Sequence, residues 1–472
     1  MKTTLLFLSV FLTTSLFGQY TQIPDPNFEQ ALINAGYDNT IDGQVITQII
    51  NNISNLNVSG SGISSIEGIE DFINLIELNC SDNSLTYIGN LNPGILRLDC
   101  SQNQINGIDL DELNLLEHLN CSSNNLSTIN LNANNLLEDL NCSSNNLSTI
   151  NLNANNLLED LNCSNNNLLD LDLSQNIDIK YLICENNAFS AIDLSTNILI
   201  TYLSVGGPNF IYNYEDIAFL PDLGYLSLNN IPNTLNLNLN FTNEFFQLFI
   251  KNCGNIILEN SILGDVSINN VGDVNLNNNY VRGISIDKMN GNCDISDITF
   301  DVDGFGSIGG LNIDSSQTSS VLISNVQKFS IQNSANLISV NISGVVDTMV
   351  VKNNPSLVCL SISTNGEIFD HYKRIEIINN NLDCLEVDEA EIAEILWSGG
   401  GVWPFSFSPE IYFSENCNND CSNTSSLTEL NSNKNLIQIL DLMGRETSFK
   451  PNTPLIYVYD DGSIEKVFSV EY

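Results

Sequence analysis

The sequence has few basic residues: 14 Lys and Arg stand against 56 Asp and Glu, which gives a formal net charge of −42. A field of this sign repels nucleic-acid phosphates and anionic membrane surfaces, so we expect no nucleic-acid partner. Histidine occurs only twice, and no GxSxG, HExxH or glycine-rich phosphate loop is present. We therefore expect no catalytic residue, no cofactor and no bound metal. The acidity is compatible with a basic partner, with divalent cations, or with a solvated surface.

Long hydrophobic runs are also scarce, and the one candidate lies at the start, from Leu5 to Phe17 after a single Lys. This pattern predicts a secretory signal peptide over residues 1–19 with cleavage near Gly18 or Gln19. The run is short for a membrane span. We expect an exported protein, extracellular or on the outer cell surface, with no integral membrane segment in the mature chain.

A repeat dominates what the sequence does contain. The stretch "LNCSSNNLSTINLNANNLLED" at 119–139 recurs letter for letter at 140–160. A fixed period of this size is the signature of a solenoid, in which each coil contacts only its neighbours and a copied coil extends the stack. The pattern LxxLxCxxNxLxxL resembles the leucine-rich repeat family, and it repeats at Cys80, Cys100, Cys121, Cys142, Cys163 and Cys184.

Each repeat contains a half-repeat, because Leu119, Cys121 and Asn124 are echoed by Ile129, Leu131 and Asn134. No helical period is present and Asn is a poor helix former. The sequence thus predicts an all-β solenoid with short strands on both sides, and it resembles short bacterial leucine-rich repeats with nested halves. The leucines should point inward and the asparagines should bond the turns.

The column cysteines have no CxxC spacing and no nearby His. We interpret them as buried thiols that pack as small apolar groups, while the export route also permits occasional disulfides between coils.

The predicted organisation has seven parts. The stretch "DPNFEQALINAGYD" favours a helix near 26–36 with Asp25 as its N-cap. The solenoid loses strict register after Val205, but short alternating runs continue. We expect the following ranges: 1–19 signal peptide, 20–50 N-terminal cap, 51–204 regular repeats, 205–387 irregular solenoid, 388–421 C-terminal cap, 422–435 linker and 436–472 a separate small β domain.

The two caps resemble those of exported leucine-rich repeat proteins of the Bacteroidetes. The resemblance rests on "IPDPNFEQALINAGYD" and "SSIEGIEDFINLIELNCSDNSL" at one end and on "LDCLEVDEAEIAEILWSGG" and "FSPEIYFSENC" at the other. It implies a disulfide between Cys384 and Cys417, with Cys359 and Cys421 as a further pair, although four cysteines allow three connectivities. We also expect a helix near 388–396.

Residues 436–472 resemble the type A C-terminal sorting domain of the type IX secretion system. The similarity is carried by "DLMGRE" at 441–446 and "NTPLIYVYDDGSIEKVF" at 452–468, and the final "VEY" departs from common family tails. The resemblance implies a sandwich-like β domain that engages the secretion machinery, carries the chain through the outer membrane and is normally removed.

The outward strand positions of the regular coils suggest a binding surface. They form a periodic polar strip, acidic in its middle and with few aromatics, which suits a repeating glycan or a protein ligand. A merely solvated strip is the alternative. We expect a secreted or surface protein for adhesion or ligand capture, with these candidate residues: His118, Asn120, Asp139, Asn141, Asp160, Asn162 and Tyr181.

Two other functions stay open. The cluster "DHYKR" at 370–374 places His371, Lys373 and Arg374 together, as in a solenoid enzyme acting on polysaccharide, although a polar turn explains it equally. A purely structural spacer is the second. Asp38, Asn39 and Asp42–Gly43 faintly resemble a calcium loop, but the Glu expected at the twelfth position is missing, so we predict no metal.

Overall fold

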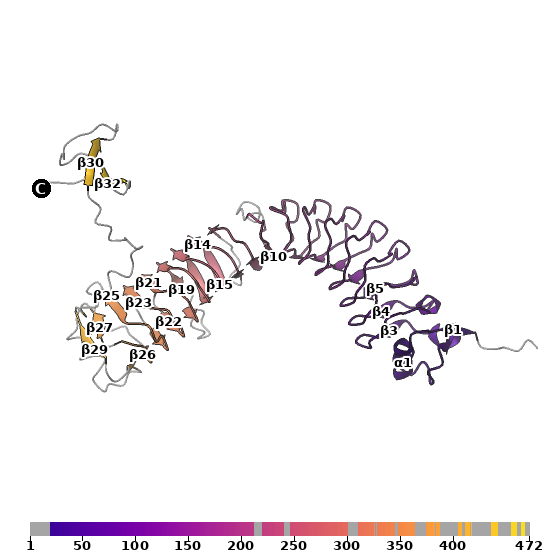
Figure 1. The fold of residues 1–472 in the computed structure, drawn as a ribbon. Helices are drawn as coiled ribbons and strands as arrows, with labels where there is room; N and C mark the ends of the chain where they lie inside the picture. Colours follow the sequence, from indigo (N-terminus) through magenta and orange to yellow (C-terminus); the bar gives the residue numbers. More distant parts are fainter. Residues whose placement is uncertain are drawn as a thin grey trace, which may run out of the picture. The chain divides into compact units, whose positions relative to one another are not determined.

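The computed structural model describes residues 19–211, 220–239, 246–300, 310–324, 326, 328–344, 348–363, 374–382, 384–387, 405–407, 411–415, 417, 436–441, 455–459 and 464–467. The chain divides into two compact units, Met1–Asn419 and Asp420–Tyr472. The first is a parallel β-solenoid of the leucine-rich repeat type, which confirms the expected fold class (Figure 1). Among the described residues, no helix is long and apolar enough to cross a membrane.

An N-terminal cap closes the first coil, as the sequence predicts. Helix α1 (Pro26–Asn34) begins at Asp25, whose Oδ1 accepts hydrogen bonds from the backbone N–H groups of Asn27 and Phe28 at 2.9 and 3.1 Å. Its Oδ2 accepts from Ser64 N at 2.8 Å, so the same carboxylate ties the cap to the first coils. Phe28 is fully buried and stacks on Phe72 with ring centroids 6.3 Å apart.

The rest of the cap pairs with this helix. Strands β1 (Tyr20–Gln22) and β2 (Gln44–Ile46) form a small antiparallel sheet, followed by the short helix α2 (Thr47–Ile50). The loop before β2 bonds the buried Glu29, whose Oε1 accepts from the N–H groups of Asp42, Gly43 and Gln44. The loop that faintly resembles a calcium site therefore holds a carboxylate of the protein itself.

The regular coils each contribute one three-residue strand to a parallel sheet, here the first sheet. Equivalent residues pair in register, as in Leu119↔Leu140↔Leu161. The opposite side of these coils consists of turns without strands. The prediction of strands on both sides is therefore wrong for this region, whose strands are β3 (Asn55–Asn57), β4 (Glu77–Asn79), β5 (Arg97–Asp99), β6 (His118–Asn120), β7 (Asp139–Asn141), β8 (Asp160–Asn162) and β9 (Tyr181–Ile183).

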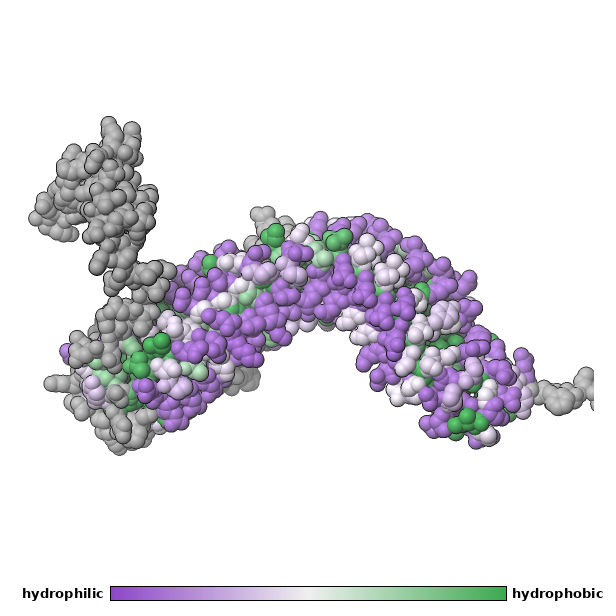
Figure 2. Space-filling model, in the orientation of Figure 1, coloured by the Kyte–Doolittle hydropathy of each residue, from purple (hydrophilic) through white to green (hydrophobic). Residues whose placement is uncertain are grey.

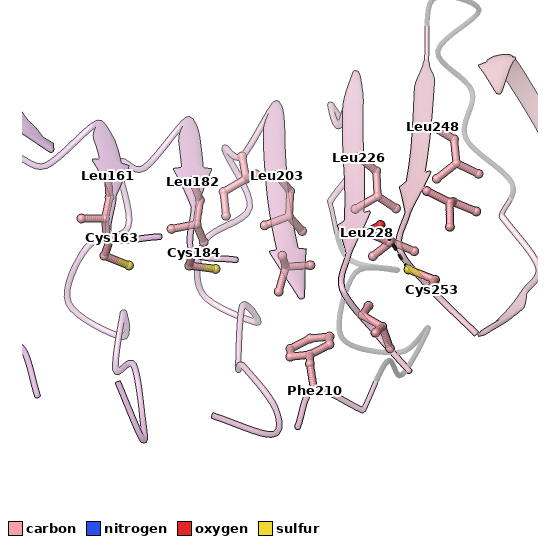
Figure 3. Packing of buried hydrophobic residues seen from close by; sticks show 14 of the residues in the cluster. Leu161, Cys163, Leu182, Cys184, Leu203, Phe210, Leu226, Leu228, Leu248 and Cys253 are labelled. Carbon is pink, nitrogen blue, oxygen red and sulfur yellow. Dashed lines mark hydrogen bonds between the residues drawn. The ribbon is translucent and has the colours of Figure 1, made fainter. Parts of the chain in front are cut away.

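The leucine and cysteine columns fill the interior. Leu161, Cys163, Leu182 and Cys184 lie against their neighbours in successive coils (Figure 3), and each is at most 1% exposed. The column cysteines are free thiols, as expected for small packing groups. Burial raises the pKa of Cys142 to about 12, so the thiol form prevails.

Two asparagine columns satisfy the backbone at the turns. In the first column, Asn145 donates through Nδ2 to the carbonyls of Cys121 and Cys142 at 3.0 and 3.1 Å, and its Oδ1 accepts from Leu126 N at 3.0 Å. In the second, Asn155 is fully buried and donates to the carbonyls of Leu131 and Asn134 in the preceding coil. These side chains supply the cross-coil bonds that a second row of strands would otherwise make.

The irregular coils continue the first sheet with longer strands. Consecutive pairings lead from β9 through the whole series, and β17 pairs with both β19 and β20. The series comprises β10 (Tyr202–Gly206), β11 (Tyr225–Asn229), β13 (Gln247–Lys251), β15 (Ile262–Asn269), β17 (Tyr280–Asp287), β19 (Thr299–Phe300), β20 (Leu311–Asp314), β22 (Lys328–Gln332), β24 (Thr348–Lys352), β26 (Arg374–Ile378) and β28 (Phe405–Phe407).

A second parallel sheet appears on the opposite side from residue 235 onward, so the prediction of two-sided coils is confirmed there (Figure 1). It contains β12 (Leu235–Leu237), β14 (Ile256–Glu259), β16 (Val274–Asn277), β18 (Cys293–Ser296), β21 (Ser320–Ser324), β23 (Ser339–Ser343), β25 (Cys359–Ser363), β27 (Cys384–Val387) and β29 (Tyr412–Ser414).

The turn after most strands contains a residue in the left-handed conformation. In the irregular coils this residue is most often Asn, for example Asn270 and Asn353 with φ of +54° and +55°. Asn tolerates this conformation better than most residues. The amides also bond to one another along the stack, since Asn270 donates to Asn252 at 2.7 Å. Such ladders account for much of the Asn in the sequence.

The end of the solenoid contains one disulfide among the described residues, between Cys384 and Cys417. Cys359 is also disulfide-bonded. Cys421, and the helix expected near 388–396, lie outside the described residues. In the second unit the described residues form an antiparallel sheet of β30 (Leu436–Asp441), β31 (Leu455–Tyr459) and β32 (Ile464–Val467).

Candidate ligand-binding face

The outward side of the first sheet in the regular coils has two columns of side chains. The outward column begins each strand and contains Asn55, Glu77, Arg97, His118, Asp139, Asp160 and Tyr181; the second column ends each strand and contains Asn57, Asn79, Asp99, Asn120, Asn141, Asn162 and Ile183. These residues line a shallow groove of about 650 Å³. All the ligand-binding candidates predicted from the sequence lie on this face.

Charges in the outward column pair with one another. Arg97 and Glu77 form an ion pair at 3.6 Å, and His118 Nδ1 contacts Asp139 Oδ2. The pKa of Asp160 is raised, first by burial and then by the charge of Asp139 in the neighbouring strand. The column thus contains two adjacent carboxylates, Asp139 and Asp160, and the charged form of Asp160 is disfavoured.

The asparagine side chains of the second column form hydrogen bonds to the turns that follow their strands. Asn141 Oδ1 accepts from Ser143 N and Oγ at 3.1 and 2.8 Å, and Asn162 bonds Ser164 in the same way at 3.1 and 2.8 Å. Asn120 repeats the arrangement with Ser122. The amide oxygens therefore fix the end of each strand, and the Nδ2 groups are what these side chains offer to a ligand.

An aromatic row continues the outward column into the irregular coils. It consists of Tyr181, Tyr202 and Tyr225 in that column, and of Phe249, which contacts Tyr225 from the second column, where it pairs with Ser227. Tyr202 and Tyr225 stack with centroids 4.1 Å apart and an interplanar angle of 7°, and Phe249 follows at 4.8 Å. Because these rings cover each other's faces, a ligand meets their edges and hydroxyl groups. Burial, with the neighbouring Tyr202, raises the pKa of Tyr225.

The sequence interpretation missed this row beyond Tyr181 and described the face as poor in aromatics. The signal was present, since Tyr181, Tyr202 and Tyr225 each precede an inward leucine. The number of residues between equivalent positions of successive coils increases after Leu203, so the row was not recognised from the sequence. Elsewhere, the visible surface of the solenoid is mainly hydrophilic (Figure 2).

The cluster at 370–374, the candidate site of a solenoid enzyme, lies largely outside the described residues. These include neither His371 nor Lys373. Arg374 begins β26, and its Nε donates to Glu376 at 2.6 Å. Among the residues that the structure describes, no group of three or more His, Cys, Asp or Glu side chains could hold a metal ion.

No protein-family model and no curated protein matches the chain. Among solved structures, it is similar to the functional domain of InlJ from Listeria monocytogenes, which includes a cysteine ladder, at 16% identity and a TM-score of 0.40 over 96% of this chain and 99% of that one. An internalin from the same organism gives 18% identity and a TM-score of 0.38 over 78% and 94%. A leucine-rich repeat protein of Leptospira interrogans gives 14% and 0.33 over 71% and 92%. These similarities assign no function to the chain.

Proposed function

We propose that this chain is an exported binding protein that holds an extended ligand, a glycan or a protein, on the outward face of the regular coils, in adhesion or ligand capture. The observation that carries the proposal is the groove of about 650 Å³, whose lining repeats from strand to strand. A periodic lining offers equivalent subsites to a periodic ligand. Weak subsites then act together through their effective concentration.

The structure directs attention to a shorter segment of the face. His118, Asp139 and Asp160 lie side by side in register, and Tyr181 follows in the next strand. The carboxylates there are adjacent, and Asp139 contacts the imidazole of His118 in its column. Tyr181 is 50% exposed and begins the aromatic row. This segment combines acceptors with an exposed aromatic edge, which favours it as the centre of the contact.

Binding along the face is tested first by probing glycan and protein arrays with the mature protein. Asp139→Ala, Asp160→Ala and the double variant are then titrated against the captured ligand. Each single change removes an acceptor that contributes about 1 kcal/mol, and the double change should weaken binding further. Glu112→Ala is the matched control, because Glu112 is an exposed carboxylate in the strand-free half of its coil. Unchanged affinity in the double variant would contradict binding on this face and point to the irregular coils after Val205, whereas a protein that captures no ligand would leave the spacer function.

We also propose that the chain is exported through a signal peptide at 1–19 and the type IX secretion machinery, which recognises residues 436–472. The three-stranded antiparallel sheet of β30, β31 and β32 is consistent with a small sorting domain. Deleting residues 436–472 should retain the protein in the periplasm, as measured by fractionation and immunoblotting. Normal amounts of truncated protein in the medium or at the surface would contradict the assignment of residues 436–472 as a sorting domain.

A further inference from the structure

A second groove lies on the first sheet in the irregular coils, and its charge is opposite to that of the chain. The groove has a volume of about 720 Å³ and lies across β20, β22, β24 and β26. Three of its lining side chains are cationic, Lys328, Lys352 and Arg374. The whole chain has only 14 Lys and Arg residues against 56 acidic ones, so this concentration is a local departure from the overall field.

The register sets the spacing of the cations. Lys328, Thr348 and Arg374 occupy one column across neighbouring strands, so Lys328 and Arg374 are two strands apart. Two strand spacings amount to about 9.6 Å. Lys352 is the last residue of β24, the strand between them. It lies on the same face of the sheet as Thr348, at the opposite end of the strand. Anionic groups spaced along an extended chain can therefore meet more than one cation at once.

Two of the three cations share one carboxylate. Lys352 and Arg374 both form ion pairs with Glu376, whose side chain is 12% exposed. Arg374 uses its Nε and one terminal nitrogen for this contact, and a guanidinium has further N–H groups to donate. Lys328 has no ion pair among the described residues, so the groove keeps an excess of positive charge. Glu376 holds two of its cations in place.

Within the described residues of β20, β22, β24 and β26, one further acidic side chain, Asp314, is engaged elsewhere. Asp314 lies two strands from Lys352 in the same column. Its Oδ1 accepts from Ser315 Oγ at 3.0 Å and from Asn333 Nδ2 at 2.9 Å in the turn. It does not line the groove. Among the described residues that line the groove, the charged side chains are therefore the three cations.

We propose that this groove binds an acidic polysaccharide, through carboxylate or sulfate groups placed on Lys328 and Arg374. Asn312, Ser330 and Thr348 line the same groove and supply polar groups for sugar hydroxyls. Nucleic acid fits less well, because single strands need exposed rings on which bases stack and Phe329, the groove's aromatic residue, is 3% exposed.

The test measures binding of labelled polygalacturonate and heparin fragments to the mature full chain by fluorescence anisotropy, with neutral dextran of matched length as a control ligand. Both anionic polymers should bind saturably and more weakly as salt rises, and the tighter one identifies the anion. Lys328→Gln should weaken binding about tenfold, the size of one charge-assisted hydrogen bond. Lys328→Glu should abolish binding.

The matched control is Lys251→Gln, which makes the same charge change at an exposed position of β13 on the same sheet, outside the groove. It should leave affinity unchanged, and circular dichroism should show all variants folded. The Asp139→Ala, Asp160→Ala double variant should bind the polyanions normally, which separates this site from the face of the regular coils. Equal binding of dextran, equal weakening by Lys251→Gln, or tighter binding of a single-stranded oligonucleotide would each overturn the proposal.

Discussion

The regular and irregular coils supply hydrogen-bond partners for their backbone groups in two different ways. In the regular coils one side has strands and the other has turns, where buried asparagines such as Asn155 bond carbonyls of the preceding coil. From β12 onward a second sheet makes these bonds between backbones, as in β14 with β16. A solenoid side can thus be closed by a side-chain column or by a strand ladder. The first demands a fixed residue in every coil, whereas the second tolerates varied sequence, which fits a second sheet that begins at Leu235, after the strict repetition has ended.

The largest expected effect is at the junction between the two regions. Gly206 has φ of +147°, and a Cβ there would stand 1.9 Å from the carbonyl oxygen of Asn229. Gly206→Ala must shift backbone in the adjoining coil, and we expect it to lower the free energy of unfolding by about 4 kcal/mol. Urea denaturation measures this. Gly107→Ala is the control, since no atom lies within 4 Å of its Cβ position, and an equally large loss there would contradict the argument.

The next effect compares the turn columns directly. Asn145→Ala leaves buried backbone groups of Cys121, Leu126 and Cys142 without their partner and should cost about 3 kcal/mol. Ser334 is the corresponding buried turn residue in the irregular coils, and it bonds Gln332 O and Ser316 N at 3.2 Å each. Ser334→Ala should cost about 1 kcal/mol. Equal losses in chemical denaturation would mean that the two regions do not differ in this way.

A smaller effect is expected when a whole regular coil is removed. Deleting residues 140–160 rejoins the chain without altering the junction, because the preceding 21 residues are identical. The protein should remain folded and lose about 2 kcal/mol, the share of stability expected for a segment of this length. Circular dichroism and urea denaturation provide the measurement. Deleting 266–283 from the irregular coils, where no identical copy exists, should disrupt folding; if both deletions behave alike, the regular coils have no special tolerance.

These differences show what the sequence could predict. The period, the inward leucines and cysteines and the Asp25 cap follow from local pattern, because burial imposes them in every coil. The absence of strands opposite β3 to β9 does not follow from local pattern, because the same alternating sequence is compatible with two arrangements. Asparagine side chains or a backbone ladder would each supply the hydrogen bonds between coils. On the candidate ligand-binding face, the contact between His118 and Asp139 depends on pairing across strands, which a linear sequence shows only once the register is known.

The smallest expected effect concerns the carboxylates of that face. The pKa of Asp160 is raised by burial and by Asp139, so its charged form is less favourable in the folded than in the unfolded state. This cost is absent below the ordinary pKa of 3.8 and grows as the pH rises through the folded value. Asp160→Asn should therefore stabilise slightly at neutral pH, by less than about 0.5 kcal/mol because this half-buried site is screened by solvent, with no gain at low pH. Thermal melts across pH measure it, and a clear destabilisation at neutral pH would refute the repulsion.

The buried cysteine column affects whether unfolding of the protein is reversible. Its thiols are protected only by burial, which keeps them protonated and out of reach of oxidants. Once a coil opens, neighbouring thiols become exposed together, their pKa falls back to the ordinary value of 9.0, and they can cross-link in any order. Unfolding under oxidising conditions then becomes a one-way event, and survival is governed by the rate of opening instead of the equilibrium stability.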